Sequence, residues 1–173
     1  MNLSAIVAFA LLFTGQHPSM PPGMSHEEHV KQMKEDALKK RGAEAMGFEQ
    51  GAAVHHFRLS PSGGSIEVAA GNPADELTIA AIRRHLRSIA SEFAAGRFDK
   101  PFQTHGEVPP GVEQMQRATD RIAYRYEDVP QGGAVRITTE DAQSLDAVHA
   151  FLRYQISEHH TGDPVTSKRR PGR

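Results

Sequence analysis

The side chains of this sequence that could do chemistry are mostly imidazoles and thioethers. The chain carries 10 histidines and 6 methionines but no cysteine. Imidazole titrates near neutral pH and is the commonest metal ligand in proteins. Without cysteine there is no thiolate ligand, thiol nucleophile or disulfide, so a bound metal would be held by histidine, methionine, carboxylate or backbone oxygen.

Methionine and histidine alternate close to the N-terminus. His29 and Met33 are four residues apart and would share one face of a helix. Thioethers select Cu(I), whereas imidazole accepts Cu(I), Cu(II) and Zn(II). We therefore expect a metal site here, copper first, formed by Met24, His26, His29 and Met33.

Two stretches of the chain repeat one pattern, with the glycine pairs Gly63-Gly64 and Gly132-Gly133 at the same place in each. Alternating apolar residues flank each pair and predict a hairpin, and apolar residues spaced by three and four follow and predict a helix. A single ββα unit cannot bury its apolar face alone. We expect an α+β fold in which ββα-ββα forms a four-stranded antiparallel sheet with two helices on one face. An N-terminal helix should precede it, starting at the capping box Ser25 to Glu28.

The two repeats differ near the ends of their helices. When Leu86 is aligned with Leu152, Ile89 falls on Gln155 and Phe93 on His159, which puts polar groups on an apolar stripe. A buried polar group without a partner costs about 1–3 kcal/mol, so these two should meet a side chain, water or ligand. The same alignment places the imidazoles of His85 and His149 at comparable edges of the two helices. We expect these residues to bind a metal-containing cofactor such as haem: His85, His149, Gln155 and His159.

The connection between the repeats offers another candidate, His105, with Glu107 nearby. Ligands and catalytic groups concentrate in such segments, so His105 joins the predicted metal ligands, and His105 with Glu107 could serve a small-molecule enzyme. No nucleophile elbow, phosphate loop or zinc-protease motif occurs in the chain. His55 shares the strand parity of Phe57 and could approach the end of the second helix.

The composition changes along the chain suggest its organisation. Residues 1–19 read as a signal peptide and leader, with an apolar run too short to span a membrane. Residues 20–50 form a linker and helix, 51–163 the duplicated domain, and 164–173 a disordered basic tail. We expect a periplasmic or secreted protein. Its net charge of −1 and a sheet face without aromatic residues argue against nucleic-acid binding.

Four groups of residues form recognisable motifs: Met20-Pro21-Pro22-Gly23-Met24-Ser25-His26-Glu27-Glu28-His29, Ile82-Arg83-Arg84-His85-Leu86-Arg87, His105 with Pro109-Pro110-Gly111-Val112, and Phe151-Leu152-Arg153-Tyr154-Gln155-Ile156 to His159 and Thr161-Gly162-Asp163. These motifs resemble those of a group of small exported bacterial proteins. The resemblance implies export and brings no assigned chemistry. Such proteins sometimes carry the label aspartate carbamoyltransferase, but this chain lacks that enzyme's Ser-Thr-Arg-Thr-Arg phosphate loop and the cysteines of its regulatory zinc site.

Together these observations predict an exported, non-enzymatic protein that binds a transition metal, copper first, or a metal cofactor. One alternative is an interaction module, such as a homodimer formed through the open sheet face. The other is the small-molecule enzyme built around His105.

Overall fold

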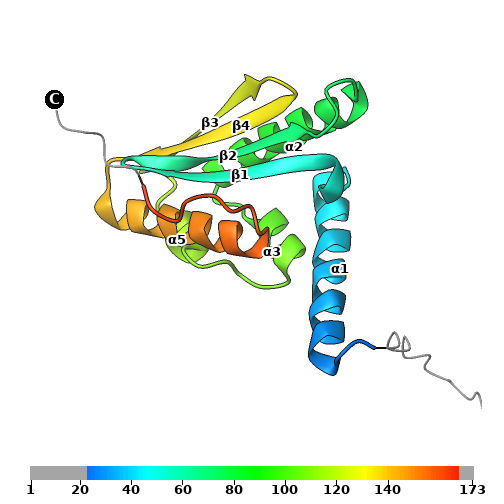
Figure 1. Ribbon diagram of the computed structural model, residues 1–173. Coiled ribbons are helices and arrows are strands. Elements are labelled where there is room, and N and C mark those ends of the chain that lie inside the picture. The colour runs from blue at the N-terminus through cyan, green and yellow to red at the C-terminus, as the bar shows by residue number, and fades with distance from the viewer. Residues whose placement is uncertain (1–22, 168–173) are drawn as a thin grey trace, which may run out of the picture. The chain divides into compact units, whose positions relative to one another are not determined.

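The computed structural model describes residues 23–167 of the chain (Figure 1). The predicted signal peptide and the last six residues of the basic tail lie outside the described residues. The chain divides between Lys34 and Glu35 into two compact units, each described by itself. Its elements are, in order, α1 (His26–Met46), η1 (Gln50–Ala52), β1 (Ala53–Ser60), β2 (Gly63–Ala70), α2 (Glu76–Ala94), α3 (Asp99–His105), α4 (Val112–Arg117), β3 (Ile122–Val129), β4 (Gly132–Thr139) and α5 (Ala142–Glu158).

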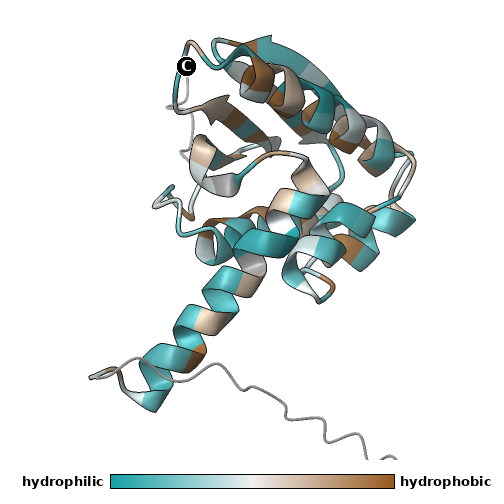
Figure 2. Ribbon diagram, turned by 90° about the vertical axis from the view of Figure 1, so that its right-hand side faces the viewer, coloured by the Kyte–Doolittle hydropathy of each residue, from teal (hydrophilic) through white to brown (hydrophobic). Residues whose placement is uncertain are grey.

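Helix α1 begins and ends where its sequence signals predict. The Ser25 N–H donates to the Glu28 carboxylate at 2.8 Å, and the Glu28 N–H donates to the Ser25 hydroxyl at 3.2 Å. Gly47 follows the helix with a φ of 77°, a left-handed conformation that suits glycine. Figure 2 shows this helix coloured mostly hydrophilic. Within residues 23–167, no helix is both long and apolar enough to cross a bilayer.

The four strands form one antiparallel sheet in the order β1-β2-β4-β3. The inner strands of the two hairpins pair with each other, so that Ile66 lies opposite Val135. Helix α2 packs mainly on β3 and β4, and α5 mainly on β1 and β2. Both helices share one core with the sheet, and this confirms the predicted α+β fold with its N-terminal helix. The largest fully buried core side chains include Ile82, Leu86, Phe93, Val135, Ile137, Val148, Phe151 and Leu152.

The glycine pairs allow the two hairpins to approach each other. A Cβ on Gly63, whose φ is 144°, would stand 2.0 Å from the carbonyl oxygen of Ile137. A Cβ on Gly132 would stand 1.9 Å from the carbonyl oxygen of Val68. Any other residue at either position would therefore force the central strands β2 and β4 apart, which explains why both repeats carry glycine there.

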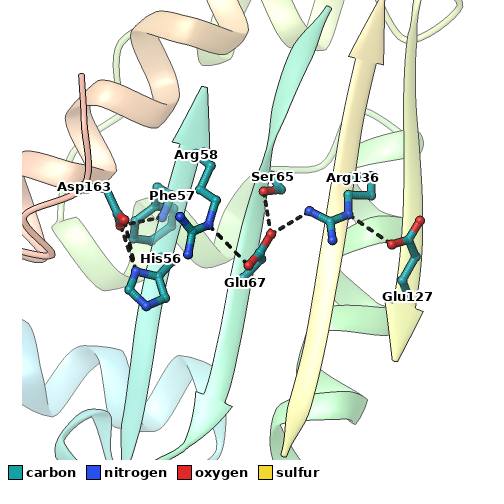
Figure 3. A network of polar contacts seen from close by, with 8 residues as sticks. All are labelled: His56, Phe57, Arg58, Ser65, Glu67, Glu127, Arg136 and Asp163. Atoms are coloured by element: carbon teal, nitrogen blue, oxygen red, sulfur yellow. Dashed lines mark hydrogen bonds and ion pairs between the residues drawn. The ribbon is translucent and has the colours of Figure 1, made fainter. Parts of the chain in front are cut away.

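The opposite face of the sheet carries a row of charged side chains that pair across the strands (Figure 3). Glu67 on β2 accepts hydrogen bonds from Arg136 on β4 at 2.6 Å and from Arg58 on β1 at 3.4 Å. Arg136 also donates to Glu127 on β3 at 3.0 Å. Although partial burial acts to raise the pKa of Glu67, the hydrogen bonds from Arg136 and Ser65 lower it below its usual value. Most charged side chains of this face thus pair with each other.

Two helical segments differ from what the residue pattern predicts. Asn72 followed by Pro73 is a typical signal for the start of a helix and predicts that α2 begins there, but the cap is Asp75, which accepts the Thr78 N–H at 3.0 Å. The Asn72 side chain instead accepts the Ala74 N–H in a turn. The segment after α2 was predicted as an irregular, proline-rich connection, yet it contains α3. Its proline, Pro101, lies in the first turn, where a missing N–H costs no helical hydrogen bond.

Candidate functional site

A small cavity opens between the sheet and the helices of the second unit. It encloses about 60 Å³. Four imidazoles line it, each from a different element: His55 from β1, His85 from α2, His105 from α3 and His159 from the end of α5. The remaining wall is mostly apolar and includes Met46, Phe57, Ile66, Val68, Leu86, Ile89, Phe93, Pro101 and Phe151.

Local structure explains why each imidazole points inward. His55 has the same strand parity as Phe57, so it faces the helices. His105 is the last residue of α3, where Gly106 turns the chain with a φ of 76°. His159 is the C-cap of α5, and its N–H donates to the Gln155 carbonyl at 3.0 Å. Helix ends and a strand thus bring distant parts of the sequence to one point.

Ring contacts link His55, His105 and His159 directly, and link His85 to His55 through Phe48. The His55 and His159 rings stack, with centroids 5.7 Å apart and planes 11° apart. The His105 ring meets His159 edge-on at 5.2 Å. His85 lies at the edge of Phe48, with ring centroids 5.9 Å apart, and Phe48 also stacks on His55 at 6.3 Å. We call His55, His85, His105 and His159 the histidine cluster.

Several buried polar atoms around the cavity have no hydrogen-bond partner among residues 23–167. His105 Nε2 and Gln155 Oε1 are 3.1 Å apart, so the ring donates to the amide oxygen. This leaves Nδ1 of His105 as a bare acceptor and the amide nitrogen of Gln155 as an unused donor. Nε2 of His55 is also buried without a partner. Such atoms normally meet water or a polar ligand, and the cavity is where either would satisfy them.

Burial keeps these imidazoles neutral at physiological pH. It lowers the pKa of His55 and His85 to about 4. It lowers the pKa of His159 to about 3, with further contributions from His55 and His105. Burial also lowers the pKa of His105, although the Gln155 hydrogen bond and two nearby carboxylates oppose it. Neutral imidazole has a free lone pair on one nitrogen, which is the form that binds metals.

One cationic side chain, Lys100, also lines the cavity. Its ammonium group is ion-paired with Glu92 and donates to the Ser88 hydroxyl at 2.8 Å. Burial acts to raise the pKa of Glu92, but the hydrogen bonds from Lys100 and Ser88 lower it overall. The lysine is thus held by its carboxylate partner on α2.

The structure brings most of the predicted cofactor site together. His85, Gln155 and His159 lie around the cavity, and His105 joins them from α3. His149 lies elsewhere. Its Nε2–H is shared between the carbonyl oxygens of Ser60 at 2.9 Å and Gly63 at 3.0 Å, where it fixes the turn of the first hairpin.

The predicted N-terminal metal residues belong to the first unit. His26, His29 and Met33 lie on α1, and Met24 lies just before it. His26 is exposed, and Met33 is 48% exposed. Within residues 23–167, no three histidine or acidic side chains stand in a geometry that would hold a metal ion as they are placed. That finding applies equally to the N-terminal residues and to the histidine cluster.

Two lining residues with imidazole or thioether side chains, His55 and Met46, were absent from the predicted site. His55 has a visible signal, because a histidine on the apolar parity of a strand must face the core. Met46, the last residue of α1, has none, since one apolar residue at a helix end looks like ordinary packing. Together they add a fourth imidazole and a thioether to the predicted residues.

The surroundings of His105 bear on the enzyme alternative. The Tyr154 hydroxyl donates to the Glu107 carboxylate at 2.6 Å, and the Tyr154 ring meets His105 edge-on at 5.0 Å. Partial burial, followed by the hydrogen bond to Glu107, raises the pKa of Tyr154. Glu107 is therefore engaged by tyrosine, and no hydrogen bond joins it to His105 in the described part of the chain.

In comparisons with family models, curated proteins and solved structures, nothing matched this chain.

Proposed function

We propose that this protein is a non-enzymatic binding protein that holds one transition-metal ion, copper first, in the cavity of the histidine cluster. The observation that carries the proposal is the pair of buried, unpartnered imidazole nitrogens, His55 Nε2 and His105 Nδ1, on one small cavity. A buried acceptor without a partner is costly in a folded protein, and a metal ion would satisfy it.

The donor set supports copper among the transition metals. The cluster supplies neutral imidazoles, and Met46 adds a thioether to the same wall. Imidazole suits copper and zinc, whereas thioether sulfur favours Cu(I). On metal binding, rotation of the His105 or His159 ring would bring its nitrogen closer to the ion. Both residues lie near the ends of helices.

The size of the cavity favours an ion over haem. About 60 Å³ holds an ion or about two water molecules, since one water takes about 30 Å³ in the liquid. A porphyrin would require the helices to separate from the sheet. We therefore propose a metal ion as the ligand, and haem binding is one outcome that the experiment can distinguish.

Export belongs to the same proposal, because it rests on the apolar run at residues 3–13 and on the resemblance to exported proteins. A Met- and His-bearing N-terminal stretch would then pass copper to the cavity or bind it independently. The N-terminal set Met24, His26, His29 and Met33 is thus a second predicted site that the experiment must separate from the first.

Calorimetric titration of the purified chain with Cu(I), Cu(II), Zn(II) and haemin tests this function. We expect one equivalent of copper to bind. The double variant His55→Tyr with His159→Phe copies the equivalent residues of the other repeat, Tyr124 and Phe93, and should lose that equivalent. A Soret band on adding haemin would instead support haem.

The matched control removes the N-terminal set with Met24→Leu, His26→Gln, His29→Gln and Met33→Leu. It should retain the copper equivalent. If the control loses it and the double variant keeps it, the N-terminal stretch is the site and the cavity is not. If no variant binds any metal more tightly than about millimolar, the interaction module becomes the better interpretation.

A further inference from the structure

The wall of the cavity carries no negative charge. None of the described residues that line it has a carboxylate or thiolate, and its polar groups are imidazoles, an amide, a hydroxyl and an ammonium group. The ammonium group is that of Lys100, which Glu92 pairs from outside the lining. Another cation, Arg41, lies close by, where its Nε donates to the Thr104 carbonyl at 3.0 Å.

This charge balance bears on which ion the site can hold. The desolvation cost of an ion grows with the square of its charge, so a dication costs about four times as much to bury as a monocation of similar size. Neutral donors leave that charge uncompensated. Structural zinc sites avoid the problem by using thiolates or carboxylates, which are lacking here.

The carboxylates near the cavity are engaged elsewhere. Glu92 is paired with Lys100, and Glu107 accepts the Tyr154 hydroxyl. Glu158 lies at the end of α5 and contributes to the field at His105 without lining the cavity. No acidic group of the described chain therefore faces the ion directly.

The softness of the donor atoms also favours a monovalent ion. Met46 supplies a polarisable sulfur, and Cu(I) accepts low coordination numbers from imidazole and thioether. We infer that the cavity selects a monovalent soft cation, Cu(I), over Zn(II) and Cu(II). This inference rests on the proposed function and adds the oxidation state of the ion.

The test compares Ag(I), a redox-inert monovalent probe, and Cu(I) with Zn(II). Each affinity is measured by competition with a chelator, without oxygen for Cu(I), on the chain that carries the four N-terminal substitutions. We expect Ag(I) and Cu(I) to bind at least about 100-fold more tightly than Zn(II), because the neutral lining leaves a dication uncompensated. Equal or tighter binding of Zn(II) overturns the inference and leaves metal binding itself intact. Binding of none of these ions overturns both.

A single added carboxylate should reverse the preference. Gln155 is 5% exposed, and its amide oxygen already faces His105, so Gln155→Glu places a negative charge in the cavity with little change of shape. We expect the affinity for Zn(II) to rise at least about tenfold relative to Ag(I), by direct Coulomb attraction. Gln143→Glu adds the same charge at an exposed position of the same helix and should leave the ratio unchanged. An unchanged ratio in a folded Gln155→Glu variant contradicts the inference.

Should Gln155→Glu fail to fold, as judged by circular dichroism, Met46→Leu provides an independent measurement. It removes the thioether and keeps the apolar volume. We expect a loss of Ag(I) affinity of about tenfold with Zn(II) affinity unchanged, because only the soft ion uses the sulfur. An equal loss for both ions would contradict the role of Met46.

Discussion

Two aromatic contacts occupy equivalent places in the two halves of the sheet. In one half, Phe93 near the end of α2 meets Tyr124 of β3 edge-on, with ring centroids 5.8 Å apart. In the other half, His159 at the end of α5 stacks on His55 of β1 at 5.7 Å. The hairpins and helices around them are alike, but the rings differ in chemistry and in geometry, since one pair meets edge-on and the other is stacked.

The neighbours of these pairs differ in the same sense. Phe93 also stacks on Phe98 at 4.2 Å and meets Phe151 edge-on at 5.9 Å, so that half is filled with carbon. Around His159 lie the amide of Gln155 and the ring of His105, together with free space. One backbone design thus supports a cluster of apolar rings on one side and a pair of imidazoles beside the cavity on the other. We therefore propose the half that carries His55 and His159 as the binding half.

The largest expected difference between the halves is in the pH dependence of stability. In the unfolded chain these histidines take up protons near pH 6.5, whereas folded His55 and His85 do so near 4 and His159 near 3. The unfolded state therefore binds more protons between these values, and the free energy of unfolding falls as pH drops from about 6.5 to 4. The slope is up to about 1.4 kcal/mol per pH unit for each histidine. Urea denaturation from pH 7.5 to 4.5 measures it.

The slope should decrease in His159→Phe, because one of the contributing histidines is removed. His160→Asn serves as the matched control, since His160 is exposed and has a φ of 49° that asparagine tolerates. A slope that is unaffected by His159→Phe would show that His159 titrates normally in the folded protein.

A smaller effect is expected when the chemistry of the polar half is copied into the apolar half. Phe93 is 1% exposed and surrounded by rings. Phe93→His loses buried apolar area and inserts a polar ring without a partner, so the free energy of unfolding at pH 7 should fall by about 3 kcal/mol. Chemical denaturation measures this value. A loss below about 1 kcal/mol would mean that the two halves are equally tolerant, which contradicts the comparison.

Much of the fold could be predicted from the sequence because its signals are local and repeated. The glycine pairs, the strand parity of Phe57 and Leu59, and the helical spacing of Leu86 and Phe93 each required only neighbouring residues. The first turn of α2 was misplaced because Asn72 and Asp75 both suit a cap, and only the turn at Asn72 decides between them. The hidden helix α3 was missed because its proline resembled a loop signal.

The site was predicted in part, and the reason is geometric. The repeat alignment correctly marked Gln155 and His159 as polar residues on a core stripe. The alignment alone could not show that His149 lies away from the cavity. Helix geometry could have shown it, because ten residues separate His149 from His159, which is about 15 Å along the helix axis. One cavity of this size cannot include both. His105 and Met46 depend on how α3 and the end of α1 pack, which no local pattern records.

The smallest expected effect comes from the reverse exchange, His159→Phe at pH 7. The phenyl ring would lie against Phe57, whose ring centroid is 5.4 Å from that of His159, and would reproduce the arrangement of Phe93. Because an apolar ring replaces a desolvated imidazole, we expect the free energy of unfolding to rise by about 1 kcal/mol. Denaturation of the metal-free protein measures it, with Phe93→His as the opposing variant. A fall instead would mean that the imidazole of His159 stabilises the metal-free fold, so that its presence would need no ligand to explain it.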